Sequence, residues 1–588
     1  MPTVVTSPRR LSAPPLPVLA SLRLARPSDS WHKRAFSVLI AAGVPIVVLL
    51  AIGRLDLAMY TMGGSFCALY GHDLPYAARA RTVAWVVAGM VAGSGAGLVT
   101  GALTDSLPVL IAVGSLLAAV QKTVCDGVRI GAPGPVILTF ISSACLFADQ
   151  PLGRVPELLL LTLVAGVLGW LVTLAPALLR RDGPERRATA RALLAAARLI
   201  DAGPLHSPAV SRAADGADAA AWHALLAARP HDAARHTPLR RLLLHAETTA
   251  ADPTAGPADA ARLRSWARLL RRRGPVPIPA WDGLRGTAME EQLLGIEAEL
   301  AEARPHRARG PALRAFAPGS PLLPIALRTG LGCLLAGGAA AALGVGRPYW
   351  AIVTAAAIYQ ANVTLTWGRA LQRVIGNALG VLLFAAAVPL IHLGPVALAC
   401  CCLVLAFAAE AFITRNYWLG SLFVTPMALL ITEFGRRQSS GGLIADRVLD
   451  TVTGAVFGLL AVVLVTNRRA LARVPRLTAA ADRARAETER HLAAGDPAPA
   501  ALEAARRRLA TALADLRAAT DTAAGEWRHR TVAVPDVLRV EQAGHRTLAA
   551  AVRYRTRAHT AADTEGPRSD AAPRDTDAPA GRGGTAAA

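Results

Sequence analysis

A few polar side chains stand inside or beside long apolar runs, and these are the residues of this chain that could do chemistry. Gln360 and Asn362 come at the end of one such run, and Arg369 and Arg373 follow shortly after it. Polar side chains at membrane depth are costly and usually face a bundle interior or a water-filled cavity. Gln360 and Asn362 could therefore line a path for a solute, or they could join helices through hydrogen bonds.

Arg369 and Arg373 are four positions apart, so they share one face of a helix at its cytoplasmic entrance. A pair of guanidinium groups can bind the carboxylate of an organic acid as the acid enters. The alternative is that both arginines anchor the cytoplasmic end of the helix. We keep Gln360, Asn362, Arg369 and Arg373 as candidates for a substrate pathway.

Three acidic residues near the ends of apolar runs could carry protons: Glu410, Glu433 and Asp450. Glu410 lies about one helical turn from the end of its run, which is close enough to pair with Arg415. Each acid is also explained as an end-of-helix charge or as half of a salt bridge. Glu410 is the candidate for proton coupling.

Enzyme chemistry is not indicated by any motif in the sequence. The chain lacks a P-loop and the HExxH, CxxC and GxSxG motifs, and only His72 and His392 of its 13 histidines come near a span. Its 7 cysteines lie in or beside apolar runs, and the three at 400–402 point in different directions on a helix. We therefore predict a protein that is not an enzyme, with no catalytic residue, no metal site and no cofactor.

The elements that must position the polar residues follow from the distribution of charge. Of the 588 residues, 53% are hydrophobic and 18% are charged, whereas about 25% charged residues are usual for a soluble domain. The charges avoid stretches of about 20 residues, the length that crosses roughly 30 Å of hydrocarbon. The predicted spans, about twelve, are 35–53, 57–71, 82–103, 107–121, 130–148, 156–179, 322–345, 348–365, 370–391, 395–413, 417–434 and 447–466.

Six spans precede a polar central region and six follow it. Short loops with Arg and Lys fall mostly on one side of both sets, which places these loops, the central region and both termini in the cytoplasm. Because both halves begin on the same side, we predict two parallel six-helix repeats related by an axis along the membrane normal. Gly166 and Gly169 in the sixth span correspond to Gly454 and Gly458 in the twelfth.

The resulting prediction is an all-α polytopic membrane protein with helical cytoplasmic regions. Its divisions are a disordered cytoplasmic tail (1–32), a first six-helix half (33–181), a helical cytoplasmic domain (182–320), a second six-helix half (321–469), a helical cytoplasmic C-terminal region (470–562) and a disordered tail (563–588). Leu263, Trp266, Leu269 and Leu270 have helical spacing in the central region. The net charge of +22 is mostly arginine and indicates coding bias, so we expect no nucleic-acid partner.

The stretch RPYWAIVTAAAIYQ at 347–360 is followed by Arg369, Arg373, Gly376 and Gly380. This pattern resembles the signature of the fusaric acid resistance, or aromatic acid exporter, family. In that family a helix that opens in Tyr-Trp and ends in Gln leads through a basic loop to a helix with spaced glycines. The resemblance implies a bacterial inner-membrane protein that exports amphiphilic or aromatic carboxylic acids.

Two aromatic pairs have a structural interpretation. Tyr349 and Trp350 open the motif helix on the outer side, and Tyr417 with Trp418 lies on the inner side. Both pairs fit the aromatic belts found where membranes meet water. The spaced glycines of the motif would let two helices approach closely.

We expect a secondary transporter that exports small amphiphilic or aromatic organic acids across the bacterial inner membrane, driven by the proton gradient. Two alternatives stay open: an organic-anion channel, and a non-transport membrane scaffold that acts in envelope assembly. The expected partners are the lipid bilayer and the organic acid substrate, and assembly into a homo-oligomer is left open.

Overall fold

The structure of the chain, a computed structural model, consists of helices and their connections wherever it is described. The described residues are 18–24, 31–128, 130–131, 133–203, 208–226, 233–251, 254–272, 275–277, 316, 320, 322–360, 363–433, 440–465, 468–494, 498–524, 536–537, 539–548, 550–551 and 554. Eight helices in these ranges are long and apolar enough to cross a membrane, and three shorter apolar helices accompany them. The prediction of an all-α polytopic membrane protein is confirmed.

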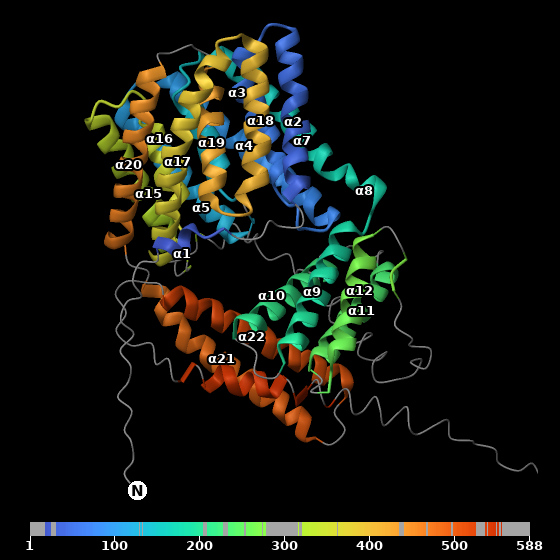
Figure 1. Cartoon of the computed structure of the whole chain (residues 1–588). Coiled ribbons are helices and arrows are strands. Elements are labelled where there is room, and N and C mark those ends of the chain that lie inside the picture. Colours follow the sequence, from blue (N-terminus) through green and yellow to red (C-terminus); the bar gives the residue numbers. More distant parts are fainter. Residues whose placement is uncertain are drawn as a thin grey trace, which may run out of the picture.

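Two groups of apolar helices form the bundle at the top of Figure 1. The first group consists of α2 (Trp31–Ala51), α3 (Ala58–Ser65), α4 (Tyr76–Leu103), α5 (Leu107–Gly127), α6 (Val136–Leu146) and α7 (Val155–Leu174). The second group consists of α15 (Leu323–Ala342), α16 (Tyr349–Ile358), α17 (Val363–Ile391), α18 (Pro395–Ile413), α19 (Tyr417–Glu433) and α20 (Ser440–Leu464). In both groups the second and fifth helices are shorter than the others.

The contacts between these helices follow a repeat. Within the halves, α3 packs on α7 as α16 packs on α20, and α4 packs on α6 as α17 packs on α19. Between the halves, α2 packs on α18, and the corresponding helices α15 and α5 pack on each other. In both contacts the first helix of one half packs on the fourth helix of the other half. A two-fold axis along the membrane normal produces this pattern, which agrees with two parallel repeats.

Glycines bring the short second helix of each half close to the long last helix. A Cβ atom on Gly454 of α20 would lie 2.7 Å from the carbonyl oxygen of Ala351 in α16. A Cβ atom on Gly169 of α7 would lie 3.3 Å from the carbonyl oxygen of Ser65 in α3. The glycines that correspond in the sequence therefore serve the same contact in the two halves.

The predicted spans 57–71 and 348–365 are not continuous crossing helices. The first is divided into a 3-10 turn (Leu55–Leu57), α3 with 8 residues and a second 3-10 turn (Phe66–Leu69). The second holds α16, whose 10 residues are about 15 Å long, half of the hydrocarbon thickness. Every residue of α16 is buried. Its apolar composition therefore reflects packing inside the bundle rather than contact with lipid.

The last apolar helix begins earlier than its hydropathy suggests. The pattern predicts a span over 447–466, but α20 begins at Ser440, so Arg447 and Asp450 lie well inside the helix. Both side chains are buried. The prediction that Asp450 lies near the outer end of its helix is wrong, because an apolar run stops at a charge whereas a helix continues when that charge faces the bundle interior.

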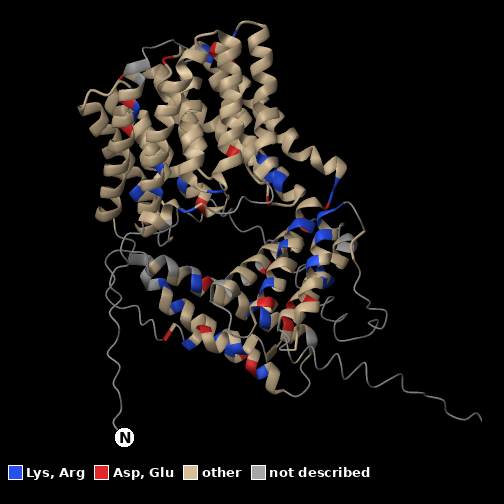
Figure 2. Cartoon of the chain, in the orientation of Figure 1, with Lys and Arg blue, Asp and Glu red and all other residues tan. Residues whose placement is uncertain are grey.

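A layer of polar helices lies below the bundle in Figure 1. α9 (Gly183–Ala202), α10 (Pro208–Leu226), α11 (Ala233–Ala251) and α12 (Pro257–Arg271) surround one apolar core, and α21 (Arg468–Ala493) packs on α22 (Pro499–Ala524). Figure 2 shows charged residues crowded on these helices and sparse within the bundle. Leu263 and Leu270 are buried in the core, whereas Leu269, predicted on the same face, is exposed.

Polar contacts join α22 to the central helices. The Nη2 atom of Arg506 lies 3.2 Å from a carboxylate oxygen of Glu247 in α11 and 2.8 Å from one of Glu503. The indole N–H of Trp222 in α10 donates to Glu247 at 2.5 Å, and the Arg507 guanidinium lies over the Trp222 ring. Burial opposes the charge of Arg506, but Glu503 and Glu247 raise its pKa above the ordinary value. The C-terminal helices are thus tied to the central domain by a buried charge cluster.

The N-terminal segment departs from the disordered tail predicted for 1–32. Within it, α1 (Val18–Leu22) lies below the bundle and contacts α17. The side-chain amides of Gln372 and Asn416 donate to the carbonyl oxygen of Ser21 at 2.6 and 2.9 Å. These bonds attach the segment to the bundle, because backbone carbonyl groups near the end of α1 accept from side chains of the second half.

Candidate binding site between the halves

A pocket lies between the two halves of the bundle. Its walls come from α2, α6 and the turn Phe66–Leu69 of the first half and from α16 to α20 of the second. It contains about 610 Å³ of space not filled by atoms, a volume that includes space open to solvent. The lining residues are Val38, Phe66, Leu69, Val136, Ile137, Phe140, Trp350, Val353, Arg373, Ala406, Ala409, Glu410, Val424, Met427, Ala428 and Arg447.

Two of the three charged residues in this apolar lining are arginines, Arg373 of α17 and Arg447 of α20. Their exposed fractions are 4% and 2%. The Nε atom of each, and Nη1 of Arg447, are buried without a hydrogen-bond partner in the described part of the chain. An unpaired buried donor costs about 1–3 kcal/mol, and more when it is charged. This end of the pocket is therefore suited to an anion.

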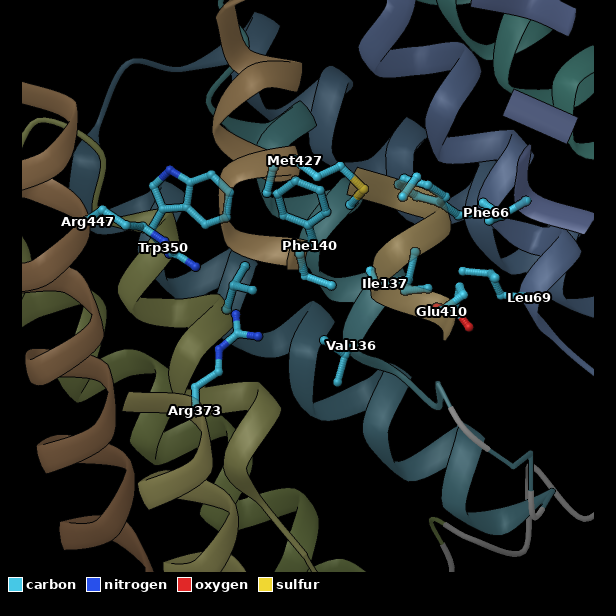
Figure 3. Close-up of a pocket in the computed structure, with 16 residues that line it drawn as sticks. Phe66, Leu69, Val136, Ile137, Phe140, Trp350, Arg373, Glu410, Met427 and Arg447 are labelled. Atoms are coloured by element: carbon cyan, nitrogen blue, oxygen red, sulfur yellow. The ribbon is translucent and has the colours of Figure 1, made fainter. Parts of the chain in front are cut away.

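The indole of Trp350 in α16 lies near both arginines (Figure 3). The Arg447 guanidinium carbon is 4.1 Å from the Trp350 ring centre, and Phe140 of α6 stacks on the indole at 5.1 Å. Tyr349 stacks on Trp350 and packs against Phe147, which directly follows α6. The prediction that Tyr349 and Trp350 form an outer aromatic belt is wrong. Both are buried, because their rings stack across the boundary between the halves.

Arg369 and Arg373 meet at one aromatic ring, that of Tyr417 at the start of α19. The Arg369 guanidinium carbon lies 3.4 Å from the ring centre, and Nη1 of Arg373 donates to the phenolic oxygen at 3.0 Å. Arg369 is therefore engaged by the ring, while Arg373 extends to the pocket. Tyr417 is buried, so its assignment to an inner aromatic belt is wrong as well.

The third charged residue, Glu410 of α18, lies on the other side of the pocket from the two arginines (Figure 3). The expected pair with Arg415 is not formed. Arg415 is exposed, and its guanidinium lies over the ring of Phe412 at 5.4 Å. Glu410 faces the pocket instead, and Arg415, on the outside of the bundle, does not reach it.

The motif glycines fix α17 against α19 and so position Arg373. A Cβ atom on Gly376 or Gly380 would come within 2.5 or 2.7 Å of a side-chain atom of α19. Between the two glycines, the Asn377 amide donates to Thr451 of α20 at 3.0 Å and accepts from Thr425 of α19 at 2.7 Å. The role of interhelical amide, considered for Gln360 and Asn362, is filled here by Asn377.

Gln360 lies at the break between α16 and α17, not within a crossing helix. The chain becomes extended at Tyr359. The Gln360 backbone N–H then donates to Thr366 at 3.1 Å, and its side chain donates to the Tyr359 carbonyl at 3.0 Å. These bonds hold the break, and Gln360 is not part of the pocket lining. Asn362 and the Glu433 side chain are outside the described residues.

Among the pocket residues that sequence reasoning did not single out, Arg447 and Phe140 matter most for binding an aromatic anion. Arg447 has a signal, because it follows Asp446 directly and stands three positions before Asp450, a spacing that puts Arg447 and Asp450 on one helix face. Phe140 has none, because its stacking partner Trp350 belongs to the other half. An aromatic contact of this kind is visible only in the folded chain.

The three charged residues of the pocket all come from the second half, between α17 and α20. Residues 335–461 match the family model described as fusaric acid resistance protein-like. The resemblance seen in the motif is thus confirmed for this part of the chain. The fusaric acid resistance-like segment contains Arg373, Glu410 and Arg447, while the opposite wall of the pocket comes from outside it.

The chain is also similar to an uncharacterized membrane protein, YvaC, of Bacillus subtilis (strain 168). The two are 34% identical over 212 residues, which are 36% of this chain and 32% of that protein. The chain therefore aligns with about a third of the length of this relative. No solved structure matches the chain.

Proposed function

We propose that the protein is a secondary transporter that exports small amphiphilic or aromatic organic acids across the bacterial inner membrane. The supporting observation is the pocket between the halves, where two buried arginines with unpaired N–H groups face an apolar, aromatic space. Binding sites of secondary transporters lie at the boundary between repeats, so that movement of one repeat against the other exposes the site to each side in turn. The termini and the polar helices lie in the cytoplasm, and the proton gradient drives export.

In this proposal the substrate carboxylate binds Arg373 and Arg447, and its apolar body packs on Trp350 and Phe140. Arg369 is a positioning residue, because its guanidinium holds the Tyr417 ring whose hydroxyl group binds Arg373. Gln360 and Asn362 stand where α16 ends and α17 begins. In the proposal, Gln360 flanks the route from the cytoplasm to the pocket, and the pathway role of Asn362 stays a prediction from the sequence.

The proposal is tested first by growth of cells with and without the protein on a set of toxic organic acids. Cells that make the protein should tolerate higher concentrations of a subset of these acids. Inverted membrane vesicles should then take up an acid from this subset only when a proton gradient is present. Conductance of the purified protein in bilayers without a pH gradient would contradict the exporter and favour an organic-anion channel.

The Arg373→Ala variant tests the site itself. Two or more charge-assisted hydrogen bonds are lost, so the apparent affinity for the acid should fall about 10- to 100-fold at unchanged membrane abundance. The control is Arg415→Ala, which removes an exposed arginine outside the pocket. Unchanged resistance in Arg373→Ala at equal abundance would remove Arg373 from the site.

A further inference from the structure

The pocket has opposite charges on opposite walls. Arg373 and Arg447 lie on one side, and Glu410 lies on the other (Figure 3). The remaining lining residues are apolar, and several of them, such as Phe140 and Met427, stand between the charged ends. A ligand that fills the space therefore meets a cationic end, an apolar middle and a carboxylate end.

Two groups near Glu410, Arg34 and Tyr70, bond to other residues. Arg34 of α2 acts electrostatically on Glu410. Its Nη2 atom is 2.8 Å from a carboxylate oxygen of Asp73, and its Nε atom is buried without a hydrogen-bond partner in the described structure. Tyr70 also lies within electrostatic range, and its hydroxyl group donates to the Gly134 carbonyl at 2.6 Å. In the described ranges no hydrogen bond or ion pair involves the Glu410 side chain. The carboxyl group is left facing the pocket.

A simple organic acid would satisfy only the arginine end. A carboxylate in an apolar environment is costly unless a cation or several donors accompany it. We infer that the transported molecule carries an amine or a similar N–H cation at the end remote from its carboxylate, so that it is a zwitterionic amphiphile held between Arg373 with Arg447 and Glu410. This inference rests on the proposed function and narrows its substrate class.

The same geometry supplies a coupling mechanism. The Glu410 carboxylate can hold the substrate ammonium group or a proton, but not both at once. When the substrate leaves on the outer side, Glu410 takes a proton there, and it gives that proton up on the inner side when the next ammonium group binds. Each exported molecule is exchanged for one proton, while Arg373, Arg447, Arg34 and Tyr70 keep their hydrogens throughout.

The test uses the full chain reconstituted in vesicles and two matched pairs of probes. One pair is 4-(aminomethyl)benzoate and 4-methylbenzoate, and the other is 6-aminohexanoate and hexanoate. Wild-type protein should transport the amine-bearing member of at least one pair about tenfold or more better than its partner. Glu410→Gln should reduce that preference to about one while transport of the partner persists. The control is Glu157→Gln, which changes an exposed acid of α7 outside the pocket.

Two results overturn the inference in different ways. The wild type could transport both members of each pair equally, or Glu410→Gln could lose transport of both equally. Either result contradicts the inference that the substrate is zwitterionic, and neither contradicts the proposed function. No transport of any probe, together with no effect of Arg373→Ala on tolerance of any acid, removes the proposed function and the inference with it.

Discussion

The Arg447 side chain packs on an aromatic ring and interacts electrostatically with Asp450, but no hydrogen bond joins it to that acid. Asp450 follows one turn later on α20 and is also buried, yet its carboxylate oxygens and two guanidinium nitrogens of Arg447 lack hydrogen-bond partners in the described structure. Packing on Trp350 at 4.1 Å directs the guanidinium toward the pocket. Donors that an ion pair would have occupied stay available to a ligand.

Replacing Arg447 should therefore weaken binding of the acid. We expect Arg447→Gln to lower the apparent affinity about tenfold or more, since it removes a charged donor from a site that is shielded from water. Arg447→Lys should restore only part of the affinity, because an ammonium group neither binds a carboxylate in two places nor lies flat on an indole. Uptake into vesicles measures both, with Arg415→Gln as the control. Wild-type uptake by Arg447→Gln would contradict the assignment.

Tyr417 gives a finer test of how Arg373 is positioned. Tyr417→Phe removes the oxygen that accepts from Arg373 but keeps the ring under Arg369. Loss of one such hydrogen bond is worth about 1 kcal/mol, so KM for the acid should rise roughly fivefold with kcat little changed. A fall in kcat at constant KM would instead show that Tyr417 acts in the conformational change.

At the scale of helices, the spacing of α17 and α19 depends on two glycines. A Cβ atom on Gly376 would lie 2.5 Å from the Ser421 side chain and 2.6 Å from the Trp418 carbonyl oxygen. We expect Gly376→Ala to destabilise the protein by about 1–3 kcal/mol, because backbone atoms must move apart. Gly338→Ala in α15, where nothing lies within 4 Å, is the control and should be neutral or stabilising. Thermal unfolding in detergent compares the two, and equal midpoints would contradict this packing.

Sequence reasoning found the apolar helices but could not tell which of them cross the membrane. The residues of α16 are as apolar as those of a span, yet the helix is short and surrounded by protein. A hydropathy window measures how favourably side chains leave water. It does not distinguish lipid from neighbouring helices as their new environment. The same ambiguity placed the start of the last span at Arg447. Buried arginines look like helix ends until the packing is known.

The sequence predicted what kind of ligand the site would bind, but not most of the residues that form it. The spacing of Arg369 and Arg373 indicated an anion site on one helix face, and Arg373 does reach the pocket. Arg447, Trp350 and Phe140 come together from α20, α16 and α6, and their meeting depends on how the halves pack. Contacts between distant segments of the chain leave little trace in local spacing.

At the scale of the whole molecule, the polar helices are joined by a buried ion cluster. Arg506→Ala would leave Glu247 without its cation, while Glu503 keeps Arg507 at 3.0 Å, and breaking a buried pair costs about 3–5 kcal/mol. We expect faster amide hydrogen exchange in α11 and α22, with the apolar bundle unchanged. Arg485→Ala removes a more exposed ion pair of α21. It should change the opening free energy measured by hydrogen exchange by less than about 1 kcal/mol. Equal effects of the two variants would contradict the role of the cluster.

The two halves share a scaffold but differ in what they bring to the pocket. All lining residues from the first half are apolar: Val38, Phe66, Leu69, Val136, Ile137 and Phe140. The similar arrangement of helices in the two halves therefore does not extend to the lining of this pocket, and the proposed transporter has one substrate position in it. Binding should saturate at one molecule per chain along a simple hyperbola. In the proposed transport cycle, the first half would serve as an apolar surface against which the charged half moves.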